Sequence, residues 1–229
     1  MSVFYFDEAR PYTTRIMTIG FHNVTPAPLA GVIDSNTDVW QKECIFESGK
    51  KYRIVAPSGK GKSTFIHYIY GLRFDYTGDV KLDHNKTTTV SPDHWADLRQ
   101  LQISIVYQDL RLFLHLTARQ NIQVKSSLYH DFDEAQITRM AERLGVESLL
   151  DKPCHTLSYG ERQRIAIIRA LIQPFNWLLL DEPFSHLDKE NSLKAATLIE
   201  EAVQERKSGV IITSLGQDLY FNCDKEFQL

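Results

Sequence analysis

The chain has 229 residues, of which 43% are hydrophobic and 24% are charged, a balance typical of a globular protein with a sizeable core. Its net charge of −3, from 26 basic and 29 acidic side chains, excludes a bulk positive field that would attract nucleic acid or an anionic membrane surface. The three cysteines, Cys44, Cys154 and Cys223, lack C-x-x-C spacing, and their odd number argues against a disulfide framework. Cysteine usage therefore indicates a reducing compartment.

Secretion and membrane-spanning segments are not expected either. The N-terminal segment MSVFYFDEARPYTTRI carries early acidic residues and lacks an apolar stretch followed by a small-residue cleavage site. No later segment approaches the roughly 20 apolar residues that a membrane-spanning helix needs. We therefore expect a cytoplasmic protein, which relies on another chain for any span if it works at a membrane.

The first part of the chain predicts strands followed by a glycine-rich loop and a helix. Between Ile16 and about Val55, the apolar runs IMTIGF, DVW, CIF and YRIVA alternate with turn residues. The last run, Tyr52 to Ala56, is apolar enough for a buried central strand. After the stretch APSGKGKST, residues from Ser63 to Leu72 have helical apolar spacing, with Gly71 as a stop. Strand, loop and helix in this order form the context that a phosphate-binding loop requires.

The remainder alternates predicted strands and helices. Strands are predicted over 79–82, 103–107, 177–180 and 209–213, and helical segments over 116–144, 158–172 and 189–207; residues 225–229 close the chain. Strands on both sides of a helical insertion predict one α/β domain over residues 1–229, with a helical subdomain at about 109–165.

The loop matches the triphosphate-binding pattern G-x-x-x-x-G-K-[ST] except at its first position, which is Ala56. In such a loop, backbone N–H groups cradle phosphates, a lysine reaches the β and γ phosphates, and a serine ligates Mg²⁺. A Cβ at position 56 costs on the order of 1 kcal/mol only if the residue needs positive φ, so we expect binding to survive. The alternative is a lysine-rich surface turn. The predicted binding residues are Ser58, Gly59, Lys60, Gly61, Lys62, Ser63 and Thr64.

Two adjacent carboxylates, Asp181 and Glu182, follow the buried run WLLL. The carboxyl end of such a strand is where open α/β sheets place ligands. Asp181 is suited to hold Mg²⁺ through water, and Glu182 to orient or deprotonate an attacking water. The alternative is a strand that ends in a solvated acidic turn. It is less favoured because a candidate phosphate loop lies upstream in the same chain.

A third segment, LSYGERQR, directly precedes an apolar-periodic helix. Ser158 and Glu161 have the spacing of a capping box, which accounts for these two residues alone. A capping box explains neither Gly160 in the first turn nor ERQR followed by IAIIRAL.

With LLLDEP following, LSYGERQRIAIIRAL resembles the signature segment and Walker B strand of ATP-binding cassette (ABC) ATPases. Gln108 in IVYQD and the S-x-L-D turn at 185–188 match further family motifs, and the resemblance covers roughly residues 16–229. The segment LRQLQISIVYQDLRLFLHLTARQNI is most similar to the branch that serves lipoprotein release, cell division and macrolide export. The resemblance implies a P-loop NTPase fold of ABC type: a mainly parallel central sheet, an N-terminal antiparallel part and a helical signature subdomain.

The resemblance also implies a function. An ABC subunit binds and hydrolyses ATP at a dimer interface and drives a separately encoded membrane permease, here from the inner face of the membrane. Its implied Mg²⁺ site comprises Ser63, Gln108 and Asp181; Gln108 senses the γ-phosphate and Glu182 activates water. Ser158 and Gly160 face the γ-phosphate of the nucleotide on a second ABC subunit, which is either an identical or a different chain.

Three departures from the family pattern affect these expectations. Ser214 stands where the family usually has a histidine, and a serine reaches less far and carries no charge, so hydrolysis is expected to be slow unless a lysine or water substitutes. Tyr159 replaces the first of the paired signature glycines, where its ring either crowds the partner's nucleotide or stacks at the interface. The segment TPAPLAG offers no aromatic residue to stack on adenine; Phe21 and Trp40 are alternatives elsewhere in the chain, and the adenine contact is left unassigned.

Two rival functions stay open. A nucleotide-gated regulatory or scaffold subunit with little hydrolysis is favoured by Ser214 and Tyr159 and opposed by Glu182. A cassette ATPase of translation or DNA repair usually has two cassettes or a long coiled-coil insertion, and this sequence has neither.

Three smaller features have more than one interpretation. Lys50 and Lys51, together with Lys60 and Lys62, are interpreted as a phosphate-facing edge rather than a nucleic-acid patch. The apolar run at 110–116 is either subdomain core or a cleft for a permease helix. A metal site at Cys154 and His155 is disfavoured, because the two residues are merely adjacent.

Overall fold

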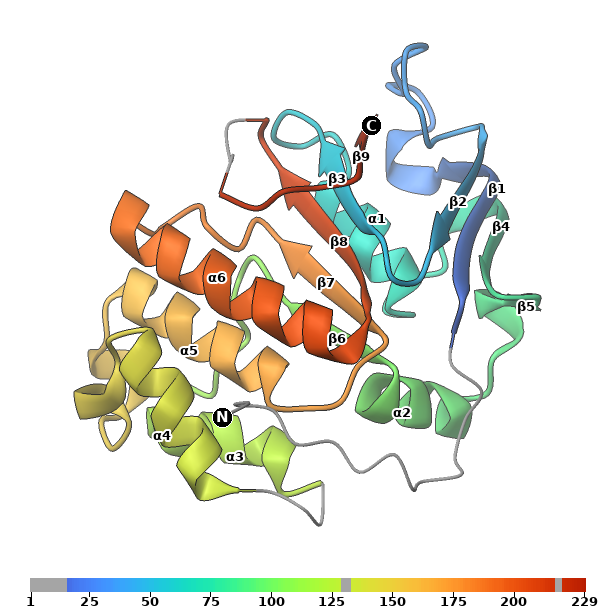
Figure 1. Ribbon diagram of the computed structural model, residues 1–229. Helices are drawn as coiled ribbons and strands as arrows, with labels where there is room; N and C mark the ends of the chain where they lie inside the picture. The colour runs from blue at the N-terminus through green and yellow to red at the C-terminus, as the bar shows by residue number, and fades with distance from the viewer. Residues whose placement is uncertain (1–15, 129–132, 217–219) are drawn as a thin grey trace.

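The computed structural model describes residues 16–128, 133–216 and 220–229. Figure 1 shows a parallel sheet flanked by helices, with a second, smaller sheet beside it. The N-terminal segment, for which no secretory signal is expected, lies outside the described residues apart from Ile16. Within the described ranges, no helix is long and apolar enough to cross a membrane.

The central sheet is parallel, with the strand order β6-β7-β8-β3-β9. Its strands are β3 (Lys51–Val55), β6 (Ile103–Val106), β7 (Trp177–Asp181), β8 (Gly209–Ser214) and β9 (Lys225–Gln228). Every residue of β6, β7 and β8 is buried, as expected for strands covered on both faces. The register pairs Val55 with Ser214 and Asp181 with Thr213, so the carboxyl ends of β3, β7 and β8 meet at one edge.

Helices cover both faces of this sheet. They are α1 (Lys62–Ile69), α2 (Pro92–Leu101), α3 (Ala118–Ser126), α4 (Glu134–Arg143), α5 (Tyr159–Leu171) and α6 (Lys189–Arg206). Leu178 and Leu180 of β7 share one hydrophobic core with α5 and α6, which lie side by side across the sheet (Figure 1). Leu179 points to the other face and belongs to the core that contains α1. Helices α3 and α4 pack against α5 on the first face.

A second sheet is antiparallel, in the order β2-β1-β4-β5. It contains β1 (Thr18–Pro26), β2 (Glu43–Glu47), β4 (Tyr76–Leu82) and β5 (Asn85–Lys86). Phe21 of β1 stacks on Phe65 of α1 with ring centroids 4.6 Å apart, which joins this sheet to the helix that follows the glycine-rich loop. Short 3-10 helices occupy Ala27–Leu29, Thr87–Thr89, Glu147–Leu149 and Cys154–Thr156.

Two sequence-based expectations about the elements are wrong in detail, and one helix was missed. The run DVW is a turn and not a strand, because the Thr37 hydroxyl accepts hydrogen bonds from the N–H groups of Val39 and Trp40. In the mostly helical section predicted over 116–144, the described residues, which exclude 129–132, form two separate helices, α3 and α4, each with its own N-cap. Helix α2 was not predicted: only Trp95 and Leu98 are buried in it, so its apolar periodicity is weak.

Candidate active site

The loop between β3 and α1 owes its shape to two glycines. Gly59 and Gly61 have φ angles of 77° and 98°, in the left-handed region that favours glycine. A Cβ on Gly61 would also lie 2.6 Å from Cδ1 of Leu29, so this position lacks room for a side chain. Ala56, in contrast, is fully buried at the end of β3 and does not have a positive φ. Its Cβ therefore introduces no backbone strain, as expected for this replacement.

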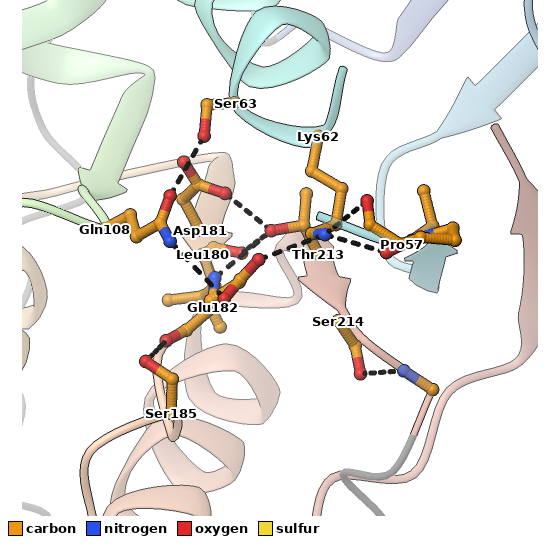
Figure 2. Close-up of polar contacts among 12 residues, drawn as sticks. Pro57, Lys62, Ser63, Gln108, Leu180, Asp181, Glu182, Ser185, Thr213 and Ser214 are labelled. Carbon is orange, nitrogen blue, oxygen red and sulfur yellow. Dashed lines mark hydrogen bonds and ion pairs between the residues drawn. The ribbon is translucent and has the colours of Figure 1, made fainter. Parts of the chain in front are cut away.

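The Lys62 ammonium lies inside the loop and has three oxygen partners. Its side chain is buried, and Nζ donates to the carbonyl oxygens of Ala56, at 2.7 Å, and Pro57, at 3.1 Å. Nζ also lies 3.1 Å from Oε1 of Glu182 (Figure 2). A buried charge is tolerated only when it is paired, and the Glu182 carboxylate is the counter-ion here.

The carboxylates that follow β7 are held in place by the neighbouring strand. Oδ1 of Asp181 accepts a hydrogen bond of 2.7 Å from the Thr213 hydroxyl, whose oxygen accepts one of 3.1 Å from the Glu182 N–H. Glu182 has a φ of 49°, which is uncommon for a residue with a side chain. Its carbonyl oxygen accepts from Gln163 Nε2 at 3.2 Å and from Ser185 Oγ at 3.0 Å. These bonds on both sides hold Glu182 in a conformation that aims its carboxylate at Lys62.

Gln108, just beyond β6, connects the loop to Glu182. Its Oε1 accepts a hydrogen bond of 3.3 Å from the Ser63 hydroxyl, and its Nε2 donates to Oε2 of Glu182 at 3.5 Å (Figure 2). Ser63, Gln108 and Asp181 also line one cavity of about 420 Å³. A hydroxyl, an amide oxygen and one carboxylate are the hard oxygen donors that suit Mg²⁺, which is commonly bound by one or two carboxylates plus substrate phosphates. The residues present thus fit this ion.

A second cavity, of about 320 Å³, gathers most of the predicted residues. Its lining comprises Pro28, Leu29, Ser58, Gly59, Gly61, Lys62, Ser63, Thr64, Arg73, Gln108 and Glu182. Lys60 is exposed and is not part of this lining. We refer to this cavity as the nucleotide cavity below.

Sequence reasoning missed Pro28, Leu29 and Arg73. Arg73 Nη1 donates to the Thr64 hydroxyl at 3.4 Å, and the same guanidinium pairs with Asp75. No motif includes these positions, although a cation shortly after the helix of a phosphate loop is a usable signal. The adenine contact stays unassigned: the rings of Phe21 and Trp40 are both buried in the core, and Phe21 stacks on Phe65.

The signature segment forms the start of α5. Ser158 is the N-cap and Glu161 completes a capping box, with Ser158 N donating to Oε2 of Glu161 at 2.7 Å. A Cβ on Gly160 would lie 2.9 Å from the His186 carbonyl oxygen, which explains why this first-turn position is a glycine. Neither Ser158 nor Gly160 lines the nucleotide cavity of its own chain. Their predicted role on a second subunit stays a prediction.

The Tyr159 side chain contacts two other segments of the same chain. Its hydroxyl donates to the Gln108 carbonyl oxygen at 2.5 Å, and its ring centroid lies 4.1 Å from that of His186. These are contacts within one chain, so both expectations for the ring at a dimer interface stay predictions.

Ser214 ends β8, beside the start of the loop. Its side chain is fully buried, and its hydroxyl oxygen accepts a hydrogen bond of 2.9 Å from Gly216 N. In Figure 2 the Ser214 hydroxyl points away from Glu182.

Two smaller expectations can now be assessed. Lys51 begins β3 at the end opposite the loop and pairs with Glu200, while Lys50 pairs with Glu47. The interpretation of these lysines as a phosphate-facing edge is therefore wrong. The run at 110–116 is partly core and partly surface: Leu110 is buried, whereas Phe113 and Leu114 are about half exposed, and a cleft for a permease helix stays a prediction.

The family model described as "ABC transporter" matches residues 42–185, which include the loop, Gln108, the signature segment and both carboxylates. The chain belongs to the ABC transporter family. It is an ATP-binding subunit of an ABC transporter, as the sequence predicts.

Relatives and solved structures agree with this assignment. The thiamine import ATP-binding protein ThiQ of Vibrio vulnificus strain YJ016 is 32% identical over 180 residues, 77% of this chain and 74% of the relative. The protein of the same name from Shigella sonnei is 33% identical over 171 residues, 73% of this chain and 71% of the relative.

Two structures of the bacterial ABC transporter cassette MJ0796 resemble the fold. One, a dimer, has a TM-score of 0.71 and 28% identity, and covers 85% of this chain and 87% of that one. The other, a dimer in a post-hydrolysis state with ADP and Pi, has a TM-score of 0.73 and 25% identity, and covers 88% of each chain. The predicted α/β fold, with its parallel central sheet and antiparallel N-terminal sheet, is confirmed.

Proposed function

We propose that this ABC cassette is a slow ATPase that drives a separately encoded integral membrane permease from the cytoplasmic face of the membrane. The observation that carries the proposal is the convergence of Lys62, Ser63, Gln108 and Glu182 on the nucleotide cavity. This convergence supplies a cation for phosphate groups, a hydroxyl for a metal, and a carboxylate beside both.

The roles follow from the chemistry of each group. Backbone N–H groups of residues 58–64 and the Lys62 ammonium neutralise the β and γ phosphates of ATP. Glu182 orients and deprotonates the attacking water, since phosphoryl transfer depends chiefly on positioning and charge neutralisation. Mg²⁺, which Ser63, Gln108 and Asp181 would hold, supplies further neutralisation of phosphate charge. Gln108 responds to the γ-phosphate because its side chain contacts both Ser63 and Glu182.

Slow turnover is part of the proposal. Ser214 carries no positive charge, and its hydroxyl is engaged with Gly216 rather than directed at Glu182. Charge that develops on the γ-phosphate in the transition state is therefore stabilised less than by an imidazolium at this position.

The assembly is a pair of cassettes, in which Ser158 and Gly160 of one chain face the γ-phosphate bound to the other. Support comes from the dimeric form of the MJ0796 cassette and from the position of both residues outside the chain's own nucleotide cavity. Pairing with a different cassette would supply the histidine that this chain lacks at position 214. The exposed Phe113 and Leu114, shortly after Gln108, suit contact with a permease helix.

The branch is proposed from the segment LRQLQISIVYQDLRLFLHLTARQNI, which is similar to cassettes of lipoprotein release, cell division and macrolide export. The relatives above are named for thiamine import, whereas the proposed branch includes export systems. The direction of transport is therefore a separate question from the function of the cassette. Substrate choice in such systems belongs to the permease.

The test compares wild type with Glu182→Gln, both isolated from native membranes with the proteins that copurify. We expect measurable wild-type turnover, a loss of at least about 100-fold in the variant, and an integral membrane partner in the preparation. Equal, negligible turnover despite ATP binding would instead support the scaffold function, which Ser214 favours. Copurification with ribosomes or DNA would contradict the transport assignment.

Dimerisation is tested separately. ATP should convert Glu182→Gln from monomer to dimer in size-exclusion chromatography, and adding Gly160→Ala should prevent this. The added Cβ would displace the start of α5 from the His186 carbonyl oxygen. Dimerisation that persists with Gly160→Ala would contradict the role proposed for the signature segment.

A further inference from the structure

The chain bends sharply just after Gln108. Leu110 and Arg111 have φ angles of 62° and 45°, two consecutive left-handed conformations in residues with side chains. Such backbone is strained and persists only where surrounding contacts hold it. We call residues 108–111 the Gln108 turn, and the contacts that hold it determine where Gln108 lies.

Both ends of the Gln108 turn are held by α5. At the start of this helix, the Tyr159 hydroxyl donates to the Gln108 carbonyl oxygen at 2.5 Å. In its last turn, the buried Arg169 donates from Nη2 to the Leu110 carbonyl oxygen at 2.6 Å and from Nη1 to the Arg111 carbonyl oxygen at 2.8 Å. The turn therefore runs along one helix and is bonded to it at each end.

Tyr159 itself is fixed from two further sides. Its ring centroid lies 4.1 Å from that of His186, and the Arg162 guanidinium carbon lies 5.5 Å from the ring centroid. His186 Nδ1 is 2.9 Å from Ser185 Oγ, which donates to the Glu182 carbonyl oxygen. The rigid Tyr159 side chain thus contacts two segments that carry site residues, the Gln108 turn and the segment that follows Glu182. Its position therefore affects the position of both.

We infer that Tyr159 is a positioning residue for ATP hydrolysis: its hydroxyl fixes the Gln108 backbone so that the Gln108 side chain bridges Ser63 and Glu182. The bridge consists of the 3.3 Å contact with Ser63 Oγ and the 3.5 Å contact with Glu182 Oε2. Tyr159 does not touch the reacting atoms in this role. The inference rests on the proposed ATPase function. It assigns a role to Tyr159, which the sequence shows only as a replacement of a signature glycine.

The test is Tyr159→Phe, which keeps the ring against His186 and removes only the hydroxyl. In hydrogen exchange followed by mass spectrometry, amides of the peptide spanning the Gln108 turn should exchange about 3- to 10-fold faster than in wild type. In steady-state kinetics, kcat should fall about 3- to 10-fold while KM for ATP stays within about twofold, because binding through Lys62 is untouched.

Tyr76→Phe is the matched control. It removes the hydroxyl of a tyrosine in β4 that is bonded to Thr87 Oγ1, and neither residue lines the nucleotide cavity. Exchange in the Gln108 turn and kcat should both be unchanged in this variant. Equal effects of the two substitutions would overturn the inference, since they would indicate a general loss of stability.

Other outcomes of these exchange and kinetic experiments also test the inference. Unchanged exchange in Tyr159→Phe, or faster exchange without a fall in kcat, would overturn the positioning role. A wild-type chain that hydrolyses no ATP would contradict the proposed function instead, and the exchange comparison would then decide alone whether Tyr159 holds the turn.

Discussion

The Lys62 ammonium and the Glu182 carboxylate, 3.1 Å apart and both buried, form an ion pair between the phosphate loop and the end of β7. The same lysine is expected to bind the β and γ phosphates of ATP, and the same glutamate to activate water. We therefore expect a triphosphate that reaches Lys62 to compete with Glu182 for the ammonium, and this competition to couple nucleotide binding to release of the Glu182 carboxylate.

Glu182→Gln should bind ATP about 3- to 10-fold more tightly than wild type, because an amide competes less well than a carboxylate for Lys62. Isothermal titration calorimetry with Mg²⁺ and a non-hydrolysable ATP analogue measures this affinity. Glu200→Gln, which removes the partner of Lys51 far from the loop, should leave it unchanged. Weaker binding by Glu182→Gln would contradict the competition.

Arg73→Ala should weaken ATP binding by about 3- to 10-fold, since its guanidinium lines the nucleotide cavity beside Thr64 and adds positive charge there. Arg73→Lys should recover part of the loss, because the charge is kept while the planar donor group is not. The readout is the dissociation constant for the same analogue. Unaltered affinity in Arg73→Ala would exclude Arg73 from the site.

Ser214→His should raise kcat about tenfold, because an imidazolium adds charge stabilisation that a hydroxyl lacks. The same change enlarges a fully buried side chain, which we expect to lower the free energy of unfolding by about 1–3 kcal/mol. Steady-state ATPase assays and urea unfolding measure the two effects separately. A folded variant that binds ATP and turns over no faster would argue that Ser214 does not limit the rate.

Lys125, in α3, gives a pH-dependent prediction. Burial, together with repulsion from Arg169 and Arg99, lowers its pKa to about 8. Because the folded pKa lies below the unfolded one, the protonated lysine destabilises the fold below pH 8, and stability recovers as the pH rises from about 8 to about 10.5.

Lys125→Met should thus raise the free energy of unfolding by about 1 kcal/mol at pH 7, allowing for solvent screening. The gain should shrink at pH 9.5. Urea denaturation at the two pH values provides the measurement. The exposed Lys152→Met serves as the control and should change stability by no more than about 0.5 kcal/mol at either pH. A gain that is the same at both pH values would mean that burial of the methionine, and not lysine ionisation, is responsible.

Much of the fold could be predicted because local patterns and global structure agree. Continuous apolar runs mark β7 and β8, which are buried on both faces, and Ser158 marks the start of α5 through its capping box. Prediction failed where the apolar pattern is misleading or weak. The run DVW is a turn, although it places Val39 and Trp40 in the core as a strand would. Helix α2 buries only Trp95 and Leu98, so it shows little apolar periodicity.

The sequence by itself determined the fold class, the phosphate loop, and the chemical types of its partners, because each lies in a contiguous stretch whose spacing is set by backbone geometry. Only the tertiary structure decided what surrounds them. Arg73 and Leu29 reach the nucleotide cavity, Phe21 and Trp40 do not, and Tyr159 bonds to Gln108, 51 residues away. Such contacts depend on how α5 and the antiparallel sheet pack against the parallel sheet, and side-chain packing between distant segments leaves no periodic trace in the sequence.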